Sequence, residues 1–122
     1  MKHLILILFL VTITYSLQAQ SCDEIMKFVK SEGGYGTSYT SYNSDAISKV
    51  TFYQITADYK TLYFAIVCFK DKSSYGCNEY IYQVGSNTKL SYSMNYLTSA
   101  GKAFWEYIQP YSKNLGCAPD FE

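Results

Sequence analysis

Two segments rich in β-branched and aromatic residues, each carrying a cysteine, constrain the fold of this chain more than any other feature. They are Thr61 to Phe69 (TLYFAIVCF) and Gly76 to Val84 (GCNEYIYQV). The Asp71-Lys72-Ser73-Ser74 segment between them is typical of a turn, so the two segments predict an antiparallel hairpin. With an even loop, the predicted register places Cys68 directly opposite Cys77, the close approach that a cross-strand disulfide needs.

Both faces of this hairpin are apolar. One face is expected to carry Leu62, Phe64, Ile66, Cys68, Cys77 and Ile81, and the other Tyr63, Ala65, Val67, Phe69, Tyr80 and Tyr82. Residues of alternate parity point to opposite faces of a strand. Either both faces are covered by other elements, or one is an exposed aromatic platform.

The segments before the hairpin predict a helix and a strand. Ser21 can cap a helix from about Cys22 to Glu32, which Gly33-Gly34 ends. Tyr35 to Ser44 is rich in Gly, Ser, Thr and Tyr and predicts a loop or an irregular edge strand. Ile47 to Ile55 follows as a strand, with a turn over Thr56 to Lys60.

The segments after the hairpin predict a fourth strand and a second helix. Apolar and polar residues alternate strictly over Lys89 to Leu97, which indicates a strand. Ser99 to Ile108 has apolar residues at helical spacing, and Pro110 limits its extension. The expected fold class is α+β: a small antiparallel sheet of three to four strands with an N-terminal and a C-terminal helix packed on it, stabilised by disulfides.

The first 19 residues have the three regions of a secretory signal peptide. Lys2 and His3 precede the apolar run Leu4 to Ile13, and Leu17-Gln18-Ala19 ends in a small residue suited to cleavage. The run is too short for a permanent membrane span. We therefore expect a signal peptide over 1–19, a single domain over 20–122, and a secreted or periplasmic location. Lipid anchoring through Cys22 is the disfavoured alternative, because Ala19-Gln20-Ser21 is a poor lipidation sequence.

Export would remove the only histidine and leave four cysteines in an oxidising compartment. The whole chain has no net charge, and loss of Lys2 leaves −1. An even number of cysteines in a small exported domain predicts disulfides, and four allow three connectivities. With Cys68 paired to Cys77, exclusion joins Cys22 to Cys117. We expect no metal and no cofactor, because no CxxC spacing and no histidine remain.

Residues 44–111 resemble a KTSC domain, a short module named for the C-terminus of some lysyl-tRNA synthetases. The resemblance rests on Ser44-Asp45-Ala46-Ile47 with Val50 and Tyr53, on the Leu62 to Phe69 strand, on Tyr80-Ile81-Tyr82 with Val84, and on Ser99, Gly101, Phe104 and Ile108. It implies a short α+β module without an established activity, for which RNA binding has been suggested.

The chain departs from that family pattern in several respects. It adds an N-terminal helix, a C-terminal tail and cysteines, has Ala100 in place of the usual basic residue, and contains no arginine. The strand predicted between Val84 and Gly101 also stands where the resemblance implies a helix.

Charge and residue chemistry disfavour two functional classes. RNA binding, the first alternative, needs cationic charge and gains from arginine, which this chain lacks. Catalysis without histidine or a free thiol would require a carboxylate-based hydrolase, the second alternative. The acids that such a hydrolase could use mostly fall in turns or on polar faces of this chain; they are Asp45, Asp58, Asp71, Glu79 and Glu106. We expect no enzyme activity.

The remaining class is a non-catalytic binding or structural module at the cell envelope or outside the cell, with a protein or a glycan as partner. Exposed tyrosines suit either partner. The candidate binding surface is Tyr35, Tyr39, Tyr42, Tyr80 and Tyr82. We expect Gly101 to serve a close helix–sheet contact and Trp105 to be partly exposed beside Phe104.

Overall fold

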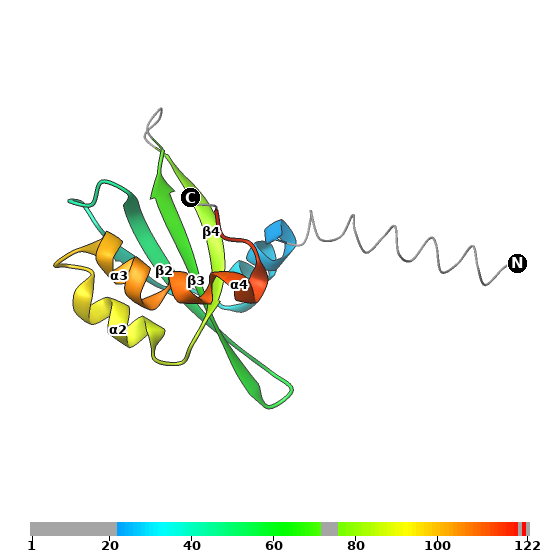
Figure 1. Cartoon of the computed structure of the whole chain (residues 1–122). Helices are drawn as coiled ribbons and strands as arrows, with labels where there is room; N and C mark the ends of the chain where they lie inside the picture. The colour runs from blue at the N-terminus through cyan, green and yellow to red at the C-terminus, as the bar shows by residue number, and fades with distance from the viewer. Residues whose placement is uncertain (1–21, 72–75, 120, 122) are drawn as a thin grey trace, which may run out of the picture.

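A computed structural model of the chain describes residues 22–71, 76–119 and 121. The predicted signal peptide lies outside the described residues. The strands β1 (Thr37–Thr40), β2 (Ile47–Ala57), β3 (Lys60–Lys70) and β4 (Cys77–Val84) form one antiparallel sheet in the order β1-β2-β3-β4 (Figure 1). Each strand pairs with the next one in the chain.

The helices confirm the predicted α+β class. A helix over residues 22–32 precedes the sheet. The elements after it are α2 (Thr88–Asn95), α3 (Ala100–Tyr107), the 3₁₀ helix η1 (Gln109–Tyr111) and α4 (Ser112–Leu115). Both predicted disulfides, Cys22–Cys117 and Cys68–Cys77, are present. No helix within the described part of the chain is long and apolar enough to cross a membrane.

Both faces of the sheet are covered. On one face, Phe52, Val67 and Tyr82 pack against Tyr92 of α2 and Phe104 of α3. Figure 1 shows α2 and α3 in front of the sheet and the N-terminal helix away from them. The other cluster contains Val29 of the N-terminal helix with Ile55, Phe64, Ile66 and Ile81. The two side-chain sets expected for the hairpin therefore fill two separate cores.

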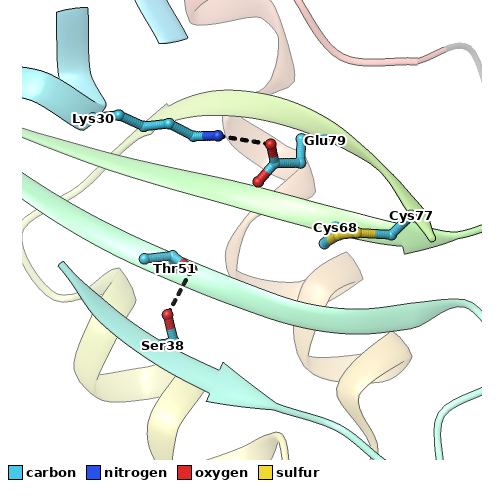
Figure 2. The surroundings of a disulfide bond; sticks show 6 residues. All are labelled: Lys30, Ser38, Thr51, Cys68, Cys77 and Glu79. Atoms are coloured by element: carbon cyan, nitrogen blue, oxygen red, sulfur yellow. Dashed lines mark hydrogen bonds and ion pairs between the residues drawn. A yellow bond between two sulfur atoms is a disulfide. The ribbon is translucent and has the colours of Figure 1, made fainter. Parts of the chain in front are cut away.

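The β3–β4 register differs by two residues from the predicted one. Cys68 lies opposite Glu79, and Cys77 lies opposite Lys70. The observed register pairs Ile66 with Ile81 in the core, whereas the predicted one would have set Ile66 against Glu79. A shift of two keeps every side chain on its expected face, and the two cysteines still bond across a Cα separation of 5.3 Å (Figure 2).

Glu79 gains a partner from this register. Its carboxylate lies 2.7 Å from the Lys30 ammonium, which ties the N-terminal helix to β4 (Figure 2). Both side chains are partly exposed, so the pair is worth at most about 1 kcal/mol. On the opposite edge of the sheet, the Ser38 and Thr51 hydroxyls hydrogen-bond at 2.8 Å between β1 and β2.

The strand predicted over Lys89 to Leu97 is wrong, because this segment forms α2 and the turn after it. Tyr92 is fully buried and stacks on Tyr96, one helical turn later. Leu90, Met94 and Leu97 are exposed on the outside. The period-two alternation was misleading because the apolar positions divide between the two sides of a helix. The helix predicted over Ser99 to Ile108 is confirmed, with Ser99 capping α3 through the Lys102 amide.

The predicted turn over Thr56 to Lys60 is tighter than expected. The strands continue to the pair Ala57 and Lys60, so only Asp58 and Tyr59 form the turn. Both have positive φ, 51° and 64°, which is the backbone of a type I′ hairpin turn. Glycine is the residue most suited to the second position, and a bulky side chain there is strained.

We therefore expect Tyr59→Gly to stabilise the protein by about 1 kcal/mol, because relief of the left-handed strain outweighs the added backbone entropy of the unfolded chain. Urea denaturation measures the change. Tyr59→Ala is the matched control, since alanine keeps the Cβ and the strain. Equal stability of the two variants would contradict the strain assigned to this turn.

The Cys22–Cys117 disulfide closes most of the domain. It joins the start of the N-terminal helix to the tail after α4, with a sequence separation of 95 and a Cα distance of 5.7 Å. Cross-linking a loop of this length restricts the unfolded chain strongly, by between about 4 and 5 kcal/mol in the chain-entropy model.

Replacing Cys22 and Cys117 together by alanine is accordingly expected to lower the free energy of unfolding by about 3 to 5 kcal/mol. A urea titration of the oxidised variant gives the value, and peptide mass mapping verifies that Cys68–Cys77 persists in it. An unchanged unfolding midpoint would show that this bridge does not hold the fold closed.

Candidate functional site

The five tyrosines of the predicted binding surface do not form one surface. Tyr35 and Tyr42 are exposed, but they lie beyond opposite ends of β1. Tyr39 and Tyr80 are partly buried against the helix-covered core. Tyr82 is 1% exposed and packs against Phe104, so it is a core residue and leaves the candidate surface.

Tyr39 belongs to an aromatic cluster beneath α2. Its ring lies 5.9 Å from that of Phe52, 6.2 Å from that of Tyr92 and 5.2 Å from that of Tyr96. These edge and tilted contacts are the favourable geometry for aromatic pairs. The helices α2 and α3 therefore cover this sheet face, and its tyrosine rings do not form an open platform for a ligand.

Tyr42 lies instead in a cleft of about 420 Å³, which we call the hydroxyl cleft. The loop after β1 forms one wall, and the turn from α2 into α3 forms the other; Figure 1 shows both on the same side of the sheet. Its lining residues are Thr40, Ser41, Tyr42, Asn43, Ser44, Asp45, Ala46, Tyr96, Leu97, Thr98, Ser99, Ala100 and Gly101. The volume lies within the range of small-molecule sites.

Local hydrogen bonds shape the first wall. The Ser44 hydroxyl accepts from the Ile47 amide at 3.1 Å, and the Lys70 ammonium donates to the Ser44 carbonyl. The Ser41 amide bonds the Ser48 carbonyl at 2.8 Å. This loop is therefore held to the ends of β2 and β3.

The second wall is set by the start of α3. The Ser99 hydroxyl accepts from the Lys102 amide at 3.2 Å, which is a standard N-cap. The Ser99 amide bonds the Asn95 carbonyl at 3.3 Å, which fixes the turn between the two helices. The cleft is thus built mainly by turn and cap residues, and the core residue Ala100 also lines it.

The surface of the hydroxyl cleft is polar and apolar in about equal parts and nearly uncharged. Most lining side chains carry hydroxyl groups, Asn43 adds an amide, and Asp45 is the one charged side chain among them. Tyr42 is 86% exposed and presents a free ring. The Ser41 Oγ is buried without a hydrogen-bond partner. Such a site can exchange hydrogen bonds with a neutral polar ligand.

A second, more apolar hollow of about 570 Å³ adjoins the cleft, with Asp45 and Ala46 lining both. Tyr80, Phe69 and Phe121 line it. Trp105 lies beside it on the Phe121 ring, at 5.3 Å between centroids, and is 52% exposed, as expected from the sequence.

Two of the acids considered for hydrolysis share one hollow, and the other three lie elsewhere. Asp45 and Asp71 line the apolar hollow together with Lys70. Glu79 pairs with Lys30, and Asp58 lies in the hairpin turn. Among residues 22–71, 76–119 and 121, no three His, Cys, Asp or Glu side chains come together in a group that could hold a metal ion.

Gly101 does not serve the close contact expected of it. A Cβ added at Gly101 would meet no atom within 4 Å. By contrast, a Cβ at Gly33 would lie 2.6 Å from the Val29 carbonyl oxygen. The cleft residues were not predicted as a set from the sequence, although Ser41 to Asp45 and Thr98-Ser99 carry the turn and cap signals that build the two walls.

Comparison with known proteins adds no relative. No family model, no curated protein and no solved structure matches the chain. The geometry of the hydroxyl cleft and the residues that line it are therefore the basis for assigning a function.

Two buried tyrosines make the fold sensitive to alkaline pH, and one of them, Tyr92, lies beside the cleft residue Ser41. Burial raises the pKa of Tyr92 to about 12, and the nearby Ser41 hydroxyl, which lies outside hydrogen-bond geometry, offsets only part of the rise. Burial also raises the pKa of Tyr82, helped by the Tyr80 phenol. Both hydroxyls lack a hydrogen-bond partner, so the fold favours their neutral forms.

Stability is expected to be complete below pH 10, where unfolded tyrosines ionise, and to fall as the pH rises towards about 12. Tyrosinate absorbance and near-ultraviolet circular dichroism should show the last tyrosines ionising together with unfolding. Tyr82→Phe with Tyr92→Phe is the control, and it should remove that late phase. Ionisation of every tyrosine near pH 10 with the fold intact would contradict the assignment.

Proposed function

We propose that this chain is an exported, non-catalytic binding module whose hydroxyl cleft takes a glycan. The observation that carries the proposal is the cleft of about 420 Å³ lined by hydroxyl and amide groups, with the exposed ring of Tyr42 at its rim. A sugar offers many hydroxyls that both donate and accept hydrogen bonds, together with an apolar ring face. Tyrosine meets both demands, because it has an apolar ring and a hydroxyl at low entropy cost.

Two features of the cleft favour an uncharged ligand. Asp45 is the one charged side chain among its lining residues, and no lysine lines it. A phosphate-bearing ligand would gain little there, because cationic contacts supply most of the affinity for phosphates.

The proposed location is outside the cytoplasm. Two disulfides join four cysteines, and bonds of this kind persist in oxidising compartments. The N-terminal sequence with its basic start, apolar run and small residue before cleavage supports export through a signal peptide over 1–19. An exported module meets glycans of the cell envelope or of the extracellular medium, which is the ligand class proposed for the cleft.

We also propose that residues 44–111 form a KTSC-like domain. The residues that carry the resemblance have clear places in this fold: Ser44 accepts from the start of β2, Ser99 caps α3, and Phe104 and Ile108 are core residues. The resemblance implies a helix between Val84 and Gly101, and α2 lies in that segment, where the sequence pattern alone had predicted a strand. RNA binding is not the function favoured, because the chain lacks arginine and Tyr82 is buried.

A glycan array probed with the oxidised protein tests the proposal. Wild-type protein should bind a subset of glycans, and Tyr42→Ala should lose about tenfold in affinity or more, because the variant lacks the aromatic ring that contacts the sugar. The matched control is Tyr59→Ala, which removes an equally exposed tyrosine at the hairpin turn, beyond the far end of the eleven-residue β2. The Tyr59 variant should bind as wild type.

Failure of wild-type protein to bind any glycan would contradict the proposed function. Equal losses in the Tyr42 and Tyr59 variants would show that binding is not located in the hydroxyl cleft. A pull-down from an envelope extract, in which protein is captured by wild type and lost in Tyr42→Ala while the array stays silent, would assign the cleft to a protein partner instead.

A further inference from the structure

Gly101 is a glycine that the fold itself does not explain. It lies in the first turn of α3, where its backbone is helical and its φ is outside the left-handed region. A Cβ placed on it would find open space within 4 Å. Glycine is the least favourable residue in a helix apart from proline, so alanine at this position would improve the isolated fold.

Five other glycines in the described part of the chain have structural reasons. Gly34, Gly36 and Gly116 have φ values of 72°, 60° and 67°, which favour glycine. A Cβ at Gly33 would collide with the Val29 carbonyl, and one at Gly85 would lie 2.5 Å from the Tyr111 hydroxyl. Gly101 has neither reason, and its open side belongs to a cleft.

The open space at Gly101 is part of the hydroxyl cleft. Gly101 lines that cleft together with Tyr42, Asp45 and Ser99. Glycine is used where a ligand must approach the backbone closely. From its place in the cleft and the absence of any internal reason for it, we infer that Gly101 is a ligand-contact residue: a sugar ring of the bound glycan lies directly against the α3 backbone at this position.

This inference rests on the proposed glycan function and adds the orientation in which a sugar ring lies in the cleft. A saccharide ring has a face of C–H groups and hydroxyls around its edge. The C–H face would lie on the bare backbone at Gly101, while the edge hydroxyls reach the polar groups of the loop after β1, including Asn43 and Asp45. A methyl group at position 101 would occupy the place of the ring face.

If Gly101 contacts the ligand, replacing it by alanine should increase the stability of the fold and decrease its affinity for the glycan. Gly101→Ala should raise the Tm, by about 2 to 5 °C for a domain of this size. The same variant should lose at least tenfold in glycan affinity. A merely structural role for Gly101 could not produce this combination, since loss of binding through misfolding would lower the Tm.

The test applies wild type, Gly101→Ala and Glu106→Ala to the same glycan array and to thermal denaturation. Glu106 is exposed on α3 and does not line the cleft, so its variant changes helix propensity in the same helix without entering the site. We expect full binding by Glu106→Ala and strongly reduced binding by a more stable Gly101→Ala.

The possible outcomes separate the two proposals. If wild type binds glycans and Gly101→Ala binds them equally well, Gly101 is not a contact residue, although the glycan function stands. If Gly101→Ala loses binding together with a lowered Tm, the fold needs the glycine and the inference is overturned. If wild type binds no glycan, the proposed function fails and this inference fails with it.

Discussion

Burial of both faces of one small sheet is the constraint on which the rest of this structure depends. The β2–β3–β4 strands carry large apolar side chains on each face, among them Ile66 on one and Val67 on the other. Leaving either face in water would forfeit about 25 cal/mol for each Å² of apolar surface. The chain therefore places α2 and α3 on one face and the N-terminal helix on the other. The Cys22–Cys117 bridge then ties that helix to the tail.

This arrangement decides where a ligand can bind. Aromatic rings that were candidates for an exposed binding platform, such as that of Tyr82, are instead buried in the core. The remaining concave and polar surface includes the end of the sheet where the loop after β1 meets the start of α3. Because Ser44 and Ser99 hold their two walls through backbone hydrogen bonds, the hydroxyl cleft is formed before any ligand arrives. A preformed site loses less conformational entropy on binding.

Much of the fold could be predicted from the sequence, but little of the site. The hairpin faces, the disulfide partners and α3 follow from local pattern and cysteine number. The α2 segment was assigned wrongly because Leu90, Tyr92, Met94 and Tyr96 alternate like a strand, and only tertiary packing decides that the tyrosines turn inward. The hydroxyl cleft joins two segments, 40–46 and 96–101, that are far apart in the sequence and carry only weak individual signals. The role of Gly101 emerges only once the open space around it is known.

The central claim is that the protein binds its ligand where the loop after β1 meets the start of α3. Amide chemical-shift mapping of the oxidised protein, titrated with the glycan that it captures most strongly on an array, tests this directly. We predict shift changes concentrated in residues 40–46 and 96–101. Changes centred on the Asp58-Tyr59 turn or on the N-terminal helix, with the cleft amides unmoved, would contradict the account.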